Sequence, residues 1–389
     1  MQSFGLPQGM RDILTEESSR RTILQEKLMH YMHSCGFDRI ETPLFEYYEL
    51  FSGGISPVDD ESIVKTIDRD GKVVVLRPDM TIPTARVAST KLKGQQRPVK
   101  LFYMGNVYRT DKKNRGAGKE FCQVGAEIYG HPGKWLDIET LAMSKESFRA
   151  AGVSDYKIDI GHVGIIKGIF EEMTLAEEKK SHIISLISEK NLVELENEVS
   201  VLNLSDRDKE MICRLPRIFG KPEDVFRNID EIMINDTVKE SADYLLQIYG
   251  KCRELDLGSN IIIDAGMTGN MKYYTGLIFK AYAQGASDVV ISGGRYDGLM
   301  KELGENSAAS GFAIYVDSML EAARENIQEQ GERKLLVIFD DSRFIEAMEY
   351  SEGWRNSGAR INLINSREIS DPEQYRKEYG YDEIINFKE

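Results

Sequence analysis

The segments VKLFYMGNVYRTD (residues 99–111) and FCQVGAEIYG (residues 121–130) decide the fold of this chain. Both are rich in β-branched and aromatic residues, as β-strands are, and only a short connection separates them. Residues 72–77 form a third short segment of the same kind. Strands joined by short connections, with no long helix between them, are typical of antiparallel sheets. The sequence therefore predicts an antiparallel sheet at the centre of the molecule.

Helices are expected before and after these strands. Thr15 is the expected N-cap of the first helix, and apolar residues then recur at helical spacing up to Gly36, which ends it. A second helix is predicted from about 137 to 151, and residues 163–255 show one helical pattern after another. Few strand-like patterns interrupt that run, so we interpret it as an α-helical insertion. Together with the sheet, these helices indicate an α+β fold.

The C-terminal part of the chain has a different pattern, in which three strands alternate with two helices. A polar segment at residues 325–334 precedes it and has the composition of a linker. The sequence therefore predicts three regions. They are a sheet domain of residues 1–162 and 256–325, the helical insertion of residues 163–255, and a small α/β domain of residues 331–389.

Composition and charge argue against several classes of protein. The 389 residues carry 50 basic and 64 acidic side chains, and the net charge of 50 − 64 = −14 repels nucleic-acid phosphates at long range. No run of about 18 uncharged apolar residues occurs, so no membrane span is predicted. The four cysteines lie far apart without a CxxC pair, and neither a metal site nor a cofactor is predicted. The N-terminal residues lack a secretory-signal pattern, so a cytoplasmic protein is expected.

Polar side chains recur at the ends and on one face of the predicted strands. Gln123 and Glu127 share a face, because side chains of a strand alternate with a period of two. Arg109 ends the preceding strand, where its guanidinium could pair with a phosphate or a carboxylate. Each feature alone also fits a purely structural role, such as an exposed strand position for Glu127 or a flexible turn for SGGRYDG (residues 292–298). Together they predict a pocket for a small zwitterion with a polar ring.

The order of the short motifs resembles class II aminoacyl-tRNA synthetases, and specifically the histidyl-tRNA synthetase family. The matching segments are GLPQGMRDIL (5–14), GFDRIETPLFEYYELF (36–51), LRPDMT (76–81), MGNVYRTD (104–111), FCQVGAEIYG (121–130), YYTGLIF (273–279) and GGRYDGL (293–299). The resemblance covers about residues 5–325. It implies a class II synthetase-like antiparallel sheet flanked by helices, a helical insertion, and a dimer that forms near Pro43.

The family's histidine-binding positions match seven residues of this chain: Asp79, Thr81, Arg109, Gln123, Glu127, Tyr273 and Tyr274. By this resemblance, Asp79, Thr81 and Gln123 face the α-ammonium group of histidine. Glu127 and Tyr274 face the imidazole ring. Arg109 matches the arginine that holds the substrate carboxylate and the α-phosphate. A carboxylate opposite an ammonium group, and another opposite a ring N–H, would form charge-assisted hydrogen bonds.

The chain departs from the family pattern where the triphosphate would be held. Gly269 stands at the position of one arginine, and Ser318 at the position of another that clamps ATP; Asp317 replaces the glutamate beside it. Ala117 and Lys119 stand where the family has an Arg-x-Arg pair. Losing one preorganised group of this kind typically costs ~10²–10³ in rate. The resemblance therefore implies an amino-acid pocket without aminoacylation chemistry.

A synthetase-like chain with these losses resembles the regulatory subunits of ATP phosphoribosyltransferase. This resemblance implies a non-catalytic partner of the short-form catalytic subunit, in a hetero-oligomer that carries out the first step of histidine biosynthesis. L-Histidine is the expected effector, which would inhibit by feedback. The C-terminal segment looks like an anticodon-binding domain that stops after its third strand. Its 9 basic and 13 acidic side chains, net 9 − 13 = −4, argue against tRNA binding.

Two other interpretations stay open at the level of sequence. An active histidyl-tRNA synthetase would need arginines at positions 269 and 318, and neither is present. A degenerate paralogue could bind RNA or another protein for regulation, but the acidic and incomplete C-terminal segment argues against it.

Overall fold

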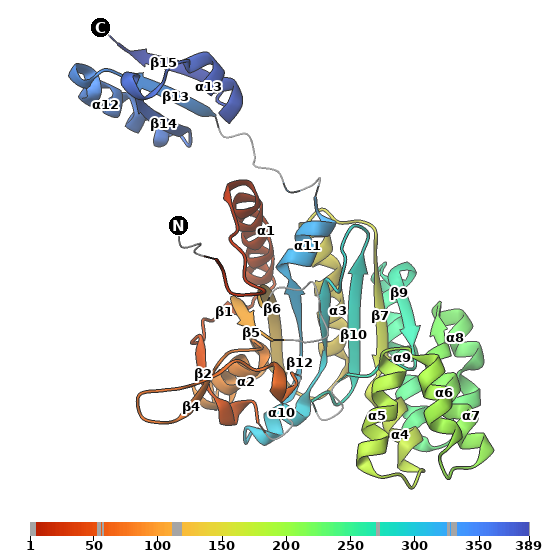
Figure 1. Ribbon diagram of the computed structural model, residues 1–389. Helices are drawn as coiled ribbons and strands as arrows, with labels where there is room; N and C mark the ends of the chain where they lie inside the picture. Colours follow the sequence, from red (N-terminus) through yellow and green to blue (C-terminus); the bar gives the residue numbers. More distant parts are fainter. Residues whose placement is uncertain are drawn as a thin grey trace. The chain divides into compact units, whose positions relative to one another are not determined.

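The computed structural model describes residues 5–52, 56, 58–110, 119–269, 273–324, 327 and 333–388. The chain forms two compact units, Met1–Ile327 and Gln328–Glu389 (Figure 1).

A large sheet forms the centre of the first unit, as the sequence predicts. Among the described residues it has nine strands in the order β1-β5-β6-β12-β11-β10-β7-β9-β8. Neighbouring strands are antiparallel except for the pairs β1–β5 and β7–β9. The bounds are β1 (Asp38–Arg39), β5 (Val99–Tyr108), β6 (Glu120–Gly130), β7 (Tyr156–His162), β8 (Phe219–Gly220), β9 (Ile261–Asp264), β10 (Leu277–Ala283), β11 (Ile291–Arg295) and β12 (Ala308–Tyr315).

One face of this sheet packs against helices α1 (Thr15–Ser34) and α3 (Lys134–Ala150) (Figure 1). Val124 and Ile128 of β6 join the buried apolar cluster that also contains Leu24 and Leu141 from the two helices. The predicted cap of α1 is wrong. Leu14 is the N-cap residue and makes no side-chain capping bond, while Thr15 is already the first helical residue. The alternation along β6 leaves its other residues on the opposite face.

The β-rich stretch that contains Pro43 is not a single strand. Its residues form β1 and, after the proline, β2 (Phe45–Tyr47), which belongs to a separate small sheet with β3 (Lys65–Ile67) and β4 (Val73–Leu76). Proline has no N–H for a strand ladder, which agrees with its place between the two strands. Helix α2 (Thr81–Thr90) follows β4.

The segment 292–298 is a strand end and not the flexible turn that its glycines suggested. Residues 291–295 form β11, and helix α10 (Asp297–Glu302) begins directly after Tyr296. A Cβ at Gly293 would lie 2.4 Å from the carbonyl oxygen of Gly311 on β12. The glycine therefore serves the close approach of neighbouring strands.

The helical insertion comprises six α-helices among its described residues, and it carries the short β8 at the sheet edge. Figure 1 shows these helices grouped beside β7 and β9. They are α4 (Val163–Glu171), α5 (Glu177–Ser188), α6 (Leu192–Ser200), α7 (Asp206–Arg214), α8 (Pro222–Asn228) and α9 (Asp236–Glu254). Asn191, Ser205 and Asn235 cap the starts of α6, α7 and α9 with their side-chain oxygens. Helices α4 and α9 pack on each other, and α9 also packs on α3.

The second unit has the expected strand–helix alternation. Strands β13 (Lys334–Phe339), β14 (Arg360–Asn365) and β15 (Glu383–Phe387) form a parallel sheet in the order β14-β13-β15. Helices α12 (Phe344–Arg355) and α13 (Pro372–Tyr379) connect them. Within the residues that the structure describes, no helix in either unit has the length and apolar character needed to cross a membrane.

Candidate functional site

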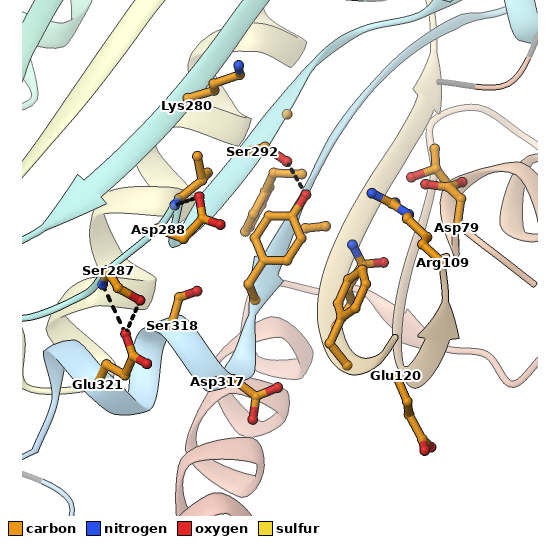
Figure 2. A pocket seen from close by; sticks show the side chains of 18 of the residues that line it. Asp79, Arg109, Glu120, Lys280, Ser287, Asp288, Ser292, Asp317, Ser318 and Glu321 are labelled. Atoms are coloured by element: carbon orange, nitrogen blue, oxygen red, sulfur yellow. Dashed lines mark hydrogen bonds between the residues drawn. The ribbon is translucent and has the colours of Figure 1, made fainter. Parts of the chain in front are cut away.

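A cavity of about 1870 Å³ lies on the polar face of the large sheet. All seven residues predicted from the motifs line it, together with Gly269 and Ser318: Asp79, Thr81, Arg109, Gln123, Glu127, Tyr273 and Tyr274. In Figure 2, Asp79 and Arg109 lie at one end of the cavity, and Ser287, Asp288 and Glu321 lie at the other. We call these the amino-acid end and the far end.

Glu127 is the most constrained carboxylate at the amino-acid end. It projects from β6 and is only 1% exposed. The hydroxyl of Tyr103 donates a hydrogen bond to it at 3.2 Å, and the hydroxyl of Tyr296 donates a second, short one. Burial raises the pKa of Glu127 to about 8, although the hydrogen bonds from its neighbours oppose that rise. In the absence of a positive partner, the carboxyl group is therefore held largely protonated at neutral pH.

The packing around Glu127 explains two glycines of the sheet. A Cβ at Gly311, the residue that pairs with Glu127 across β12, would lie 1.7 Å from the Glu127 Oε2 atom. A Cβ at Gly125 would lie 2.4 Å from the Tyr103 hydroxyl. Both glycines therefore leave room for the polar groups at the base of the pocket.

Asp79 and Thr81 lie at the start of α2. A carboxylate oxygen of Asp79 accepts a hydrogen bond from the Ile82 backbone N–H at 2.8 Å, which fixes the side chain at the N-terminal end of the helix. Burial raises the pKa of Asp79, and the nearby charge of Arg109 opposes this rise. Arg109 itself is held by a 2.7 Å hydrogen bond from Nε to the Pro78 carbonyl. Its guanidinium lies 5.3 Å from the centre of the Phe121 ring.

Gln123 is buried, yet its amide oxygen has no partner among the described residues. It lies on the same face of β6 as Glu127 and lines the same cavity. An unsatisfied buried acceptor costs about 1–3 kcal/mol, so a hydrogen-bond donor on a ligand would remove that cost. The α-ammonium group of an amino acid is such a donor.

Three tyrosines form the aromatic wall of the pocket. The rings of Tyr273 and Tyr274 meet edge to face with centres 4.7 Å apart, and Tyr273 stacks on Tyr296 at 5.4 Å. Tyr103 and Tyr296 were not among the predicted site residues, although both bond to Glu127. Tyr296 stands in the quoted motif GGRYDGL, and Tyr103 stands beside MGNVYRTD. Their roles depend on the pairing of distant strands.

Gly269 is packed against Tyr274, and this contact leaves no room for an arginine side chain at position 269. A Cβ at position 269 would lie 2.4 Å and 2.8 Å from two ring carbons of Tyr274. An arginine therefore cannot replace this glycine unless the tyrosine ring moves. The aromatic wall of the amino-acid end occupies part of the space that the arginine side chain would need.

At the far end, the described lining carries charges of both signs. Asp288, Asp317 and Glu321 lie there, and Lys280 and Arg324 line the same cavity. Asp317 pairs with Arg21 at 2.6 Å and with Arg11 at 3.2 Å. Ser318 lies beside it, and Lys119 donates its backbone N–H to the Gly9 carbonyl; Ala117 lies outside the described residues. The Asp317 pairs consume positive charge that a triphosphate would need.

Ser287 and Glu321 form a further polar contact at the far end. Glu321 accepts hydrogen bonds from the backbone N–H and the hydroxyl of Ser287, as the dashed lines in Figure 2 show. Within the described part of the chain, no group of three or more His, Cys, Asp or Glu side chains is arranged to hold a metal ion.

Comparison with known proteins agrees with the motifs. The histidyl-tRNA synthetase family model matches residues 9–319. The ATP phosphoribosyltransferase regulatory subunit of Alkaliphilus metalliredigens is 31% identical over 387 residues, which is 99% of this chain and 98% of the relative. The same subunit of Clostridium botulinum is 33% identical over 386 residues, or 98% of this chain and 91% of the relative.

Two solved structures share the fold. A protein from Bacillus halodurans, described as an ATP phosphoribosyltransferase regulatory subunit/histidyl-tRNA synthetase, superposes with a TM-score of 0.87 at 29% identity and covers 100% of this chain and 99% of its own. Histidyl-tRNA synthetase from Nostoc sp. PCC 7120 gives a TM-score of 0.78 at 20% identity, with 98% of this chain and 90% of that chain covered. The second likeness concerns the fold alone.

Proposed function

The chain belongs to the histidyl-tRNA synthetase family and, within it, to the ATP phosphoribosyltransferase regulatory subunits, and from this premise we propose that it binds free L-histidine in the pocket of Glu127 without activating it. The protein then acts as the histidine sensor of a hetero-oligomer with the short-form catalytic subunit. It takes part in the first step of histidine biosynthesis, in the cytoplasm, and catalyses no aminoacylation.

One observation carries the proposal. The amino-acid end of the cavity offers polar groups that suit a histidine zwitterion, while Gly269 and Ser318 stand where the synthetase pattern has arginines. Gln123 offers an unpaired buried acceptor to the ammonium group, and Glu127 offers a buried carboxyl to the imidazole. Arg109 supplies the positive charge for the ligand carboxylate.

Regulation requires only that histidine prefers the inhibited form of the complex. Couplings between ligand sites are typically about 1–3 kcal/mol, which corresponds to a change of about 5–150-fold in affinity. A sensor that has no chemical step to perform can use all of its ligand contacts for this preference.

The proposal is tested by calorimetric titration of the purified chain with L-histidine, first alone and then with the short catalytic subunit. We expect saturable binding that Glu127→Gln weakens by about 1.5–3 kcal/mol, or roughly 10- to 150-fold in Kd. Glu120→Gln is the matched control. Glu120 lies on the same strand and lines the cavity, but Asn106 and Tyr108 hold its carboxylate.

Two results would count against this function. Equal histidine affinity in the wild type and in Glu127→Gln would show that histidine does not bind beside Glu127. Absence of histidine binding, both to the chain and to the complex, would refute the sensor role itself.

A further inference from the structure

A series of polar contacts, continuous through the peptide bond between Arg295 and Tyr296, leads from the pocket to the helical insertion. It contains four side chains that lie outside the predicted histidine site: Tyr296, Arg295, Asp137 and Tyr244. Arg295, Asp137 and Tyr244 are not among the residues that line the cavity, so binding at the pocket does not by itself explain their polar contacts.

The path begins at the base of the pocket. The Tyr296 hydroxyl donates to Glu127, and the Tyr296 ring stacks on Tyr273, which also lines the cavity. Tyr296 is 2% exposed, and its backbone N–H donates to the Ala309 carbonyl at 2.9 Å. A ligand that hydrogen-bonds to the Glu127 carboxylate or displaces the Tyr273 ring would therefore change the contacts of Tyr296.

The next residue in the chain, Arg295, makes the contacts away from the pocket. Its Nε donates to Asp297 at 2.9 Å, and its Nη1 donates to the Gly133 carbonyl at 2.9 Å. The same Nη1 lies 3.5 Å from a carboxylate oxygen of Asp137, at the start of α3. The guanidinium thus ties the end of β11 to α3.

Asp137 connects α3 to the helical insertion. Its side chain is fully buried, and the Oδ2 atom accepts a short hydrogen bond from the Tyr244 hydroxyl of α9. The other carboxylate oxygen has no hydrogen-bond partner among the described residues. The Tyr244 ring lies 5.4 Å from the ring of His162, which caps the start of α4. Tyr244 of α9 therefore contacts both this buried carboxylate and the residue that caps α4.

A second backbone connection runs beside the first. The Thr275 N–H donates to the Arg295 carbonyl at 2.8 Å, and the Val163 N–H donates to the Gly276 carbonyl at 3.1 Å. The segment that carries the pocket tyrosines is thereby bonded both to Arg295 and to the first residue of α4. Side-chain contacts and backbone hydrogen bonds thus both connect the pocket with the start of the insertion.

We propose that the Tyr296–Arg295–Asp137–Tyr244 contacts relay occupancy of the pocket to helices α4 and α9 of the insertion. This proposal rests on the proposed function, because the ligand that starts the relay is L-histidine. Tyr244 and Asp137 are positioning residues in this scheme: they act through Arg295 and do not touch the ligand. Substitutions along such networks change coupling by about 2–30-fold.

Hydrogen–deuterium exchange on the full chain, with and without saturating L-histidine, tests the relay. In the wild type we expect histidine to change amide exchange in residues 163–171 and 236–254. In Tyr244→Phe we expect histidine affinity within about twofold of the wild type, but an exchange response in α4 and α9 reduced by about 2–30-fold. Asp137→Asn is the second variant, in case the first one folds poorly. Where histidine binds only with the catalytic subunit present, the exchange is measured on the complex.

Tyr249→Phe is the matched control. Tyr249 lies on the same helix as Tyr244 and also donates to a carboxylate, that of Glu223, but this bond stays within the insertion. We expect it to keep the wild-type response. A wild-type response in Tyr244→Phe and Asp137→Asn would overturn the relay while leaving the sensor in place. An equal loss in Tyr249→Phe would also overturn it, since the effect would then be general loosening of α9. Absence of histidine binding anywhere would instead refute the proposed function and the relay with it.

Discussion

Glu127 combines burial with hydrogen bonds from tyrosine hydroxyls, and its ionisation depends on both. Its pKa is raised from the usual 4.5 to about 8, chiefly by burial. The folded protein therefore keeps a proton that the unfolded chain releases above pH 4.5. Stability from this group is fully present below pH 4.5 and is lost as the pH rises through 8.

This sign leads to a prediction for unfolding without ligand. The free energy of unfolding of the wild type, relative to Glu127→Gln, is expected to fall by on the order of a few kcal/mol between pH 5 and pH 8.5. Urea unfolding at several pH values measures it, with Glu120→Gln as the background. A difference that does not change with pH would show that the Glu127 carboxyl group is not held protonated in the folded protein.

Gly269 gives a second prediction at the scale of one residue. In Gly269→Ala the added methyl group must displace the Tyr274 ring, whose nearest carbon is 2.4 Å from the new Cβ position. We expect histidine affinity to fall by about tenfold, because a shifted tyrosine wall no longer fits the ligand. Titration calorimetry checks this, and Gly250→Ala, where nothing lies within 4 Å, is the control. Unchanged affinity in Gly269→Ala would show that the position of the Tyr274 ring does not affect histidine binding.

The sequence predicted part of this pocket and missed another part for a physical reason. The period of two along one strand was enough to place Gln123 and Glu127 on a common face. Tyr103 pairs with Gly125 across β5 and β6, and Tyr296 follows β11, so their contacts with Glu127 depend on strand register. Register follows from packing across the sheet, which a single strand's pattern does not contain.

At the scale of elements, β2 exposes an apolar surface that matches the expected dimer. Phe45 and Tyr47 are 50% and 51% exposed, and the alternation of the strand puts them on one face, opposite to the buried Glu46. Single exposed apolar residues are ordinary, but adjacent large ones on one strand often mark an interface. We expect self-association through this face.

Phe45→Asp is therefore expected to shift the protein from dimer to monomer in sedimentation velocity, because a carboxylate would be desolvated in the interface. Ile67→Asp is the control. Ile67 is 70% exposed on β3 of the same small sheet, and the strand pairing places it on the opposite face. A dimer that survives Phe45→Asp would place the self-association surface elsewhere.

Helical periodicity predicted several elements correctly, but the glycines of β11 suggested a different structure from the one observed. Helix α1, the helical run of the insertion and the C-terminal alternation follow from local periodicity. The glycines of SGGRYDG suggested a flexible turn, yet Gly293 and Gly294 lie in β11, where the neighbouring backbone leaves no room for a side chain. A flexible turn and a crowded strand give the same glycine pattern, and the positions of β10 and β12 distinguish them.

At the scale of the whole molecule, we expect the fold to keep an amino-acid pocket without nucleotide chemistry, because Gly269 and Ser318 stand where the synthetase pattern has arginines. Asp317 at the far end of the cavity is already paired with Arg11 and Arg21, and the chain as a whole carries a net charge of −14. Both features disfavour a polyphosphate or an RNA partner, and neither hinders a small zwitterion. A regulatory role for this chain needs only the pocket and a connection to the partner subunit.

The most direct test of this account is an assay of the short-form catalytic ATP phosphoribosyltransferase, with and without this chain, as L-histidine is titrated. We predict that activity depends on the chain, that histidine inhibits the complex, and that Glu127→Gln raises the inhibitory histidine concentration by roughly 10- to 150-fold. Activity that is indifferent to the chain, or histidine inhibition that is identical in the wild type and in Glu127→Gln, would contradict the account.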